Sequence, residues 1–281
     1  MPDLAPDLTA RETIGFRVEL IGSDSAGTGK IIFHELGDGR PVIMFASLGR
    51  EASDFNELAQ TLADNGYHVL LVQPPYIDDA VPSAREPNLF DLAKDVQPIL
   101  SRLDQPAILL GHAFGNRLAR AVATQYPDHT AGVILLAAGG KRPIARKAST
   151  ALIESFNPAL PDDIRSEAVS YGFFAEGNAI PNHWMRGWHS KTAMIQGDAT
   201  RATASEDWWA GGDTPMLVIS GAQDTIAPPQ DTIDLLEAEF PDRITAVRLD
   251  GAGHALLPEK PDEIAAAILT WLETLPEKDA S

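Results

Sequence analysis

The stretch Ala107-Ile108-Leu109-Leu110-Gly111-His112-Ala113-Phe114-Gly115 decides the fold of this chain. It opens with an apolar run, and the helical pattern Leu118, Ala119, Val122 and Tyr126 follows it. We therefore expect a buried strand, a sharp turn and a helix. Where such a turn serves acyl transfer, its middle residue is a Ser with an exposed oxygen, and small flanking residues permit the strained backbone. Here the middle residue is Ala113, whose methyl group attacks nothing.

Apolar runs and helical patterns alternate on both sides of this stretch. The expected strands cover residues 42–46, 68–72, 107–110, 132–137, 216–220 and 244–249. The expected helices cover residues 54–65, 88–103, 118–126, 229–240 and 261–275. Repetition of strand, helix and strand implies right-handed crossovers and a doubly wound, mostly parallel α/β sheet. Ahead of it, an alternating segment at 14–20 and a second expected strand at 30–35, joined by a Gly-rich turn at 26–29, predict an antiparallel hairpin.

The alternation stops between residues 141 and 213, where short helices and no convincing strand are predicted. We expect residues 1–140 and 214–281 to form the sheet-based core, with residues 141–213 inserted as a helical cap. Aromatic side chains are frequent in this insertion, and small-molecule sites have apolar and aromatic walls. We expect Trp208 and Trp209 to form the core of the insertion. The expected pocket walls are His183, Trp184 and Trp188.

The composition limits the partners of the chain. Lys and Arg total 22 while Asp and Glu total 40, giving a net charge of −18, which disfavours nucleic acids and anionic membranes as partners. The chain has no Cys, which excludes disulfides, thiolate metal sites and a Cys nucleophile. No apolar run approaches the roughly 20 residues that span a bilayer. Residues 1–7 are acidic and Pro-rich, unlike a secretion signal. We expect a cytoplasmic monomer or homodimer that acts on a small molecule.

Two further polar residues follow predicted strands. Asp224 comes after the strand at 216–220, and His254 comes after the strand at 244–249 in the sequence Gly251-Ala252-Gly253-His254. Open α/β sheets bind ligands at the carboxyl ends of their strands. The chain order of sharp turn, acid and His matches that of catalytic triads on such sheets. We therefore expect Ala113, Asp224 and His254 to share one site.

With these residues in place, the chain resembles the α/β-hydrolase fold superfamily from about residue 14 to residue 275. The resemblance implies an eight-stranded, mostly parallel sheet, a helical cap and a site beneath the cap. It also implies that Asp224 orients His254, that His254 acts as the base, and that Ala113 stands at the nucleophile position. The wording Gly-His-Ala-Phe-Gly-Asn is similar to a bacterial subgroup in which Ala is native at this position. Replacement of a Ser by Ala is the alternative.

The loop after the strand at 42–46 reads Ser47-Leu48-Gly49-Arg50, where many relatives have His-Gly. An oxyanion hole is built from backbone N–H groups, so Leu48 and Phe114 can still supply its two donors. Ser47 is expected in the pocket, with a displaced nucleophile as the lesser alternative. Arg50 either holds a substrate anion or, as the favoured alternative, is an exposed loop residue. His112 either packs under the turn or lines the pocket.

A basic run begins the insertion, at Lys141, Arg142, Arg146 and Lys147. Such a run is usually a solvated face, and binding of a carboxylate is the alternative. No phosphate-cradling Gly loop occurs, and the histidines lack the spacing of metal ligands. We therefore expect neither a metal nor an organic cofactor.

These features predict a hydrolase that acts on a small, partly apolar ester, lactone or activated ketone. Without a Ser nucleophile, His254 backed by Asp224 would deprotonate a water or the substrate, a task that suits an imidazole with an ordinary pKa of about 6.5. A cofactor-free lyase, isomerase or oxygenase is one alternative. A ligand-binding protein without catalysis is another, and a serine hydrolase whose Ser is replaced at position 113 is the third.

Overall fold

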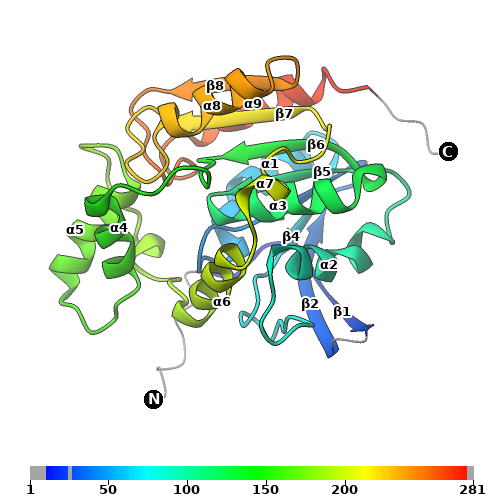
Figure 1. Cartoon of the computed structure of the whole chain (residues 1–281), viewed down its shortest axis with the longest axis horizontal. Coiled ribbons are helices and arrows are strands. Elements are labelled where there is room, and N and C mark those ends of the chain that lie inside the picture. The colour runs from blue at the N-terminus through cyan, green and yellow to red at the C-terminus, as the bar shows by residue number, and fades with distance from the viewer. Residues whose placement is uncertain (1–10, 25–26, 277–281) are drawn as a thin grey trace.

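The computed structural model describes residues 11–24 and 27–276 (Figure 1). Residues 1–7, with their expected non-secretory character, lie outside the described residues, as does Ala26 of the expected Gly-rich turn. None of the helices in the described ranges has the length and hydrophobicity required to cross a bilayer.

The described residues form one eight-stranded sheet with the strand order β1-β2-β4-β3-β5-β6-β7-β8. The strands are β1 (Phe16–Asp24), β2 (Gly27–Leu36), β3 (Arg40–Phe45), β4 (Tyr67–Val72), β5 (Ala107–His112), β6 (Thr130–Leu136), β7 (Met216–Gly221) and β8 (Ile244–Leu249). β2 pairs antiparallel with β1 and with β4, and the remaining neighbours are parallel. The expected eight-stranded, mostly parallel sheet is confirmed.

Helices cover both faces of the sheet. They are α1 (Asn56–Asp64), α2 (Leu89–Leu100), α3 (Phe114–Gln125), α8 (Ile233–Glu239) and α9 (Pro261–Leu272). Helices α2, α3 and α8 pack in one hydrophobic cluster, and α1 and α9 pack in another. In β5, Leu109 belongs to the first cluster while Ile108 and Leu110 belong to the second. Because both faces of β5 are buried, its sequence is apolar without alternation.

Several boundaries differ from those expected. Pairing extends β1 and β2 as far as Asp24 and Gly27. The helix expected at 54–65 is a 3-10 turn, η1 (Ala52–Phe55), followed by α1. The helix expected at 229–240 is likewise divided into η4 (Pro229–Asp231) and α8. It is interrupted because Thr232 leaves the helical region, with φ −132° and ψ −83°.

The chain between β6 and β7 is helical and contains no strand within residues 141–213, all of which are described. It holds α4 (Arg146–Ser155), α5 (Asp162–Phe173), η3 (Asn182–Met185), α6 (Ser190–Arg201) and α7 (Ser205–Trp208). Figure 1 shows α4 and α5 side by side at one edge of the molecule, with the arrowheads of β6 and β8 pointing toward them. The β6–β7 insertion therefore stands at the end of the sheet where the strands finish.

The structure places the tryptophans differently from the expectation. Trp184 and Trp188 lie in the hydrophobic cluster of the insertion itself, whereas Trp208 and Trp209 lie in the cluster that α2 and α3 form on the sheet. The ring centroids of Trp208 and Trp209 are 4.7 and 4.4 Å from the guanidinium carbon of Arg120 on α3. The expectation for these two residues was wrong because the insertion has already returned to the sheet when it reaches α7.

Candidate active site

Ala113 lies at the tip of the turn between β5 and α3. Its φ of 49° and ψ of −106° are unusual for a residue with a side chain. The turn is tight because glycines flank it: a Cβ on Gly111 would lie 2.2 Å from the carbonyl carbon of Gly115, and a Cβ on Gly115 would lie 1.9 Å from the carbonyl oxygen of Phe45. The N–H of Ala113 donates to the carbonyl oxygen of Leu136 at 2.9 Å. The turn thus keeps the geometry that presents a nucleophile, although a methyl group occupies the position.

His254 and Asp224 form a buried pair. Nδ1 of His254 is 2.8 Å from Oδ2 of Asp224. The other oxygen, Oδ1, accepts hydrogen bonds from the N–H groups of Ile226 at 2.9 Å and Ala227 at 2.8 Å. A carboxylate can only accept, so the proton of the neutral imidazole lies on Nδ1 and the lone pair lies on Nε2. This is the tautomer in which His254 can take a proton from a ligand.

His112, the residue before Ala113, is fully buried and forms a hydrogen bond to the backbone of His254. Its Nε2 donates to the backbone carbonyl of His254 at 2.8 Å, and its Nδ1 is buried without a hydrogen-bond partner in the described residues. Burial, reinforced by the charge of His254, lowers the pKa of His112 to about 4. His112 is therefore neutral at neutral pH, and of the two roles left open for it, packing under the turn is the one seen.

Ser47 and Leu48 follow β3 and line the same cavity as Ala113, Phe114 and His254. No acceptor among the described residues takes the N–H of Leu48 or of Phe114. Two free backbone donors beside Ala113 are what an oxyanion requires. The cavity has a volume of about 100 Å³, which is room for a small ligand or several waters.

The β6–β7 insertion holds the loop that carries Leu48. The N–H of Gly49 donates to Oε1 of Gln196 at 2.7 Å, and the N–H of His189 donates to the carbonyl of Gly49 at 2.8 Å. The φ of Gly49 is +58°, and a Cβ there would lie 2.5 Å from the ring of Phe156. The position of the Leu48 N–H thus depends on the insertion.

Arg50 is neither an exposed loop residue nor a residue of the cavity, the two alternatives expected for it. The side chain is fully buried rather than exposed, and it does not line the cavity. Its Nε and Nη2 donate to the two carboxylate oxygens of Asp54 at 2.8 and 2.7 Å. Its guanidinium carbon lies 4.4 and 4.7 Å from the ring centroids of Trp184 and Trp188. Arg50 is therefore a structural link between the loop and the insertion.

The expected pocket walls do not reach the cavity either. Trp184 and Trp188 are buried against Arg50, and His183 is half-buried beside them on η3. Burial lowers the pKa of His183. None of these three residues lines the cavity that contains Ala113 and His254.

The sequence reasoning missed several residues that line the cavity. Phe173 of α5 stacks edge-on against the ring of His254, with centroids 5.7 Å apart, and Leu152 and Ile226 extend this apolar wall. Arg117 also lines the cavity. Its position four residues after Ala113 was a usable signal, because residues i and i+4 share one face of a helix. From the basic run, Arg142 reaches the cavity as well.

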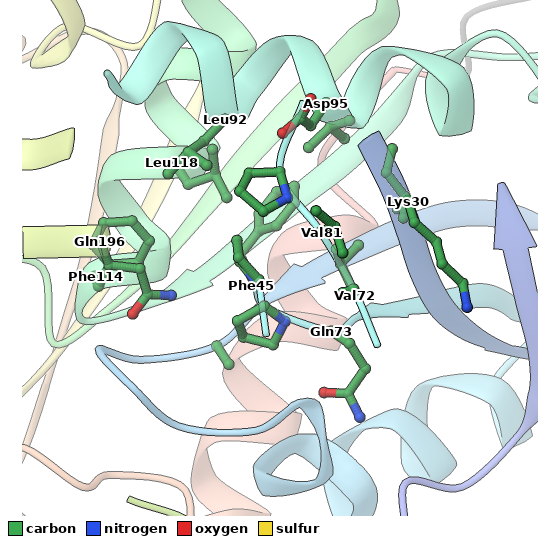
Figure 2. Close-up of a pocket in the computed structure, with 17 residues that line it drawn as sticks. Lys30, Phe45, Val72, Gln73, Val81, Leu92, Asp95, Phe114, Leu118 and Gln196 are labelled. Atoms are coloured by element: carbon green, nitrogen blue, oxygen red, sulfur yellow. The ribbon is translucent and has the colours of Figure 1, made fainter. Parts of the chain in front are cut away.

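Phe114 also borders a second cavity, of about 60 Å³ (Figure 2). Figure 2 shows Phe114 and Gln196 at one end of this cavity and Lys30 at the other. Its remaining walls are mainly apolar, including Phe45, Val72 and Leu92. Because Gln196 also binds the N–H of Gly49, this cavity adjoins the support of the loop that carries Leu48 but contains neither Ala113 nor His254.

The sheet order, the sharp turn after β5, and the Asp–His pair after β7 and β8 together define a hydrolase-like enzyme with an α/β-hydrolase fold. The chain belongs to the alpha/beta hydrolase family, whose family model matches residues 39–267.

Three known proteins illustrate what this chain is similar to. The (E)-2-((N-methylformamido)methylene)succinate hydrolase of Acinetobacter baylyi is 23% identical over 257 residues, which cover 87% of this chain and 94% of that protein. Protein ABHD8 of Mus musculus is 26% identical over 68% of this chain, and the match spans 45% of that protein. A thermophilic esterase from Thermogutta terrifontis, solved with malate bound, has a TM-score of 0.71 at 22% identity, covering 92% of this chain and 98% of that chain.

Proposed function

We propose that this protein hydrolyses a small, partly apolar ester, lactone or activated ketone, with His254 as the base, Asp224 as its orienting partner and no nucleophilic Ser. One observation carries the proposal: the His254–Asp224 hydrogen bond of 2.8 Å stands beside a cavity that also contains Ala113. The similarity to a succinate-derivative hydrolase over most of both chains supports hydrolysis as the reaction class.

In this mechanism water replaces the missing nucleophile. Nε2 of His254 takes a proton from water while the water oxygen bonds to the substrate carbonyl carbon. The oxyanion that forms accepts hydrogen bonds from the N–H groups of Leu48 and Phe114. Collapse of this intermediate breaks the bond to the leaving group, which takes the proton back from His254. Because Ala113 lacks the oxygen of a Ser, no covalent acyl-enzyme forms at this position.

A turnover experiment in ¹⁸O-water tests the proposal. We expect the wild-type protein to release product acid labelled with ¹⁸O from a panel of small esters and lactones. His254→Asn should lower the rate by about 10²- to 10⁴-fold, the usual contribution of a general base. His129→Asn is the matched control, because His129 is exposed on the turn that follows α3.

The remaining functions give different results in the same experiment. Turnover that needs His254 but leaves the product unlabelled would indicate C–H deprotonation by a lyase, isomerase or oxygenase. Saturable binding without turnover would indicate a ligand-binding protein, and full activity of His254→Asn would refute the base. A serine hydrolase with a replaced Ser predicts that Ala113→Ser reacts with a phosphonate probe and gains activity, and the codon of the source gene then shows which residue is native.

A further inference from the structure

Arg117 is a half-buried cation in the candidate active site, and no anionic partner for it is found among the described residues. It lies on α3, and its side chain lines the cavity with Ala113 and His254. Its Nη1 makes one long hydrogen bond, 3.4 Å, to the hydroxyl of Thr200. Its Nε is buried and has no hydrogen-bond partner in the described residues. No carboxylate in the described part of the chain forms an ion pair with it.

Arg120, on the same helix, is a buried arginine whose guanidinium nitrogens all have hydrogen-bond acceptors. It also lacks an ion pair within the described residues, but its Nε donates to the carbonyl of Asn116 at 3.3 Å and its Nη1 to that of Trp209 at 3.3 Å. Its Nη2 donates to the carbonyl of Gly139 at 3.2 Å and to the side-chain oxygen of Asn116. Backbone dipoles and two tryptophan rings thus replace an acid at Arg120. The part of the chain that the structure describes offers Arg117 nothing comparable.

The missing partner is unusual in a chain with 40 acidic and 22 basic residues. Buried charges are normally paired, because an unpaired one keeps its desolvation cost. Burial lowers the pKa of Arg117 to about 10, which still leaves the guanidinium charged at neutral pH. Arg142 adds a second positive side chain to the cavity, and Asp231 is the acidic residue among the lining residues. The cavity is therefore equipped for an anion.

We propose that Arg117 binds a carboxylate of the substrate, so that the substrates of this site are small carboxylic acids that also carry the reactive ester, lactone or ketone carbonyl. A guanidinium binds a planar carboxylate with two parallel hydrogen bonds. The apolar wall of Leu152, Phe173 and Ile226 contacts the carbon skeleton, and Arg142, exposed on the basic run, attracts the anion to the cavity. The inference rests on the proposed function, since it assigns the substrate class of the same site.

Calorimetric titration with succinate tests the inference without any turnover. One carboxylate of succinate mimics the bound group, and the other mimics the product acid beside Leu48 and Phe114. Succinamide has the same length and no charge. We expect the wild-type protein to bind succinate at least about tenfold more tightly than succinamide, and Arg117→Gln to bind succinate about 10- to 100-fold more weakly.

Three variants make the result specific. Arg201→Gln removes an equal charge from an exposed ion pair on α6 and should bind succinate like the wild-type protein. Arg117→Lys keeps the charge without the two-pronged geometry and should bind with intermediate affinity, which keeps the inference testable if Arg117→Gln does not fold. His254→Asn should lose turnover yet retain succinate binding.

The outcomes separate this inference from the proposed function. Absence of succinate binding by the wild-type protein, equal affinity for succinate and succinamide, or wild-type affinity in Arg117→Gln would overturn the role of Arg117 and leave His254 untouched. Full turnover by His254→Asn would overturn the proposed function, while the binding data would still report on Arg117.

Discussion

Replacing Asp224 by Asn should invert the proton position on His254. In the wild-type protein Oδ1 of Asp224 accepts two N–H groups, those of Ile226 and Ala227, while Oδ2 accepts Nδ1–H of His254. An asparagine has one oxygen and one NH₂ group. The two backbone donors select the oxygen, because an NH₂ group there would face two N–H groups. The NH₂ group therefore faces His254 and donates to Nδ1, which moves the imidazole proton to Nε2 and removes the base.

The size of the effect follows from these contacts. In a Ser-His-Asp triad the same substitution lowers kcat about 10⁴-fold through the wrong tautomer, which is about 5 kcal/mol of activation free energy. We expect a loss of roughly 10³- to 10⁴-fold here. Hydrogen bonds to a neutral acceptor are weaker than those to a charged one, so the free energy of unfolding should fall by roughly 1–3 kcal/mol. The variant should therefore remain folded but inactive.

Nitrogen NMR of ¹⁵N-histidine protein measures the tautomer directly. In the wild-type protein Nδ1 of His254 should carry the proton, and in Asp224→Asn Nε2 should carry it, with turnover lost in parallel. Asp250→Asn, an exposed residue shortly before His254, is the matched control and should change neither signal. If Asp224→Asn retains the Nδ1–H tautomer, or keeps activity within tenfold of wild type, the account of the Asp–His pair is wrong.

Two further predictions concern stability. The pKa of His112 falls from an ordinary 6.5 to about 4 on folding, so between these pH values the unfolded chain binds a proton that the folded chain does not. The free energy of unfolding should therefore fall by roughly 3 kcal/mol as the pH drops from 6.5 to 4. Thermal unfolding of His112→Gln should be less sensitive to pH in this range. Arg50→Met leaves the buried carboxylate of Asp54 without its partner and should cost roughly 3–5 kcal/mol in denaturant unfolding; a double variant that also carries Asp54→Leu should recover much of this loss, and no recovery would contradict the assigned pairing.

The parts of the fold that the sequence predicts are those that depend on local pattern. Strands such as β5 are recognisable because both faces are buried, and the positions of Asp224 and His254 follow from the strands that precede them. The burial and the partners of Arg50 could not be predicted from local sequence pattern. Its partner Asp54 is only four residues away, but the burial of Arg50 depends on Trp184 and Trp188, which are distant in sequence and reach it only through the tertiary fold. Trp208 and Trp209 were misassigned for the same reason.

The support of His254 does not involve the side chain at position 113. Asp224 is held by two backbone N–H groups, and the carbonyl of His254 is held by His112. The turn itself is held by the close approach of Gly111, Gly115 and Phe45. Ala113 has a φ of 49°, a backbone conformation that costs roughly 1–3 kcal/mol for a residue with a side chain. Under the proposed function, His254 and the N–H groups of Leu48 and Phe114 act on the reacting molecule, and the small side chain of Ala113 leaves space for that molecule in the cavity.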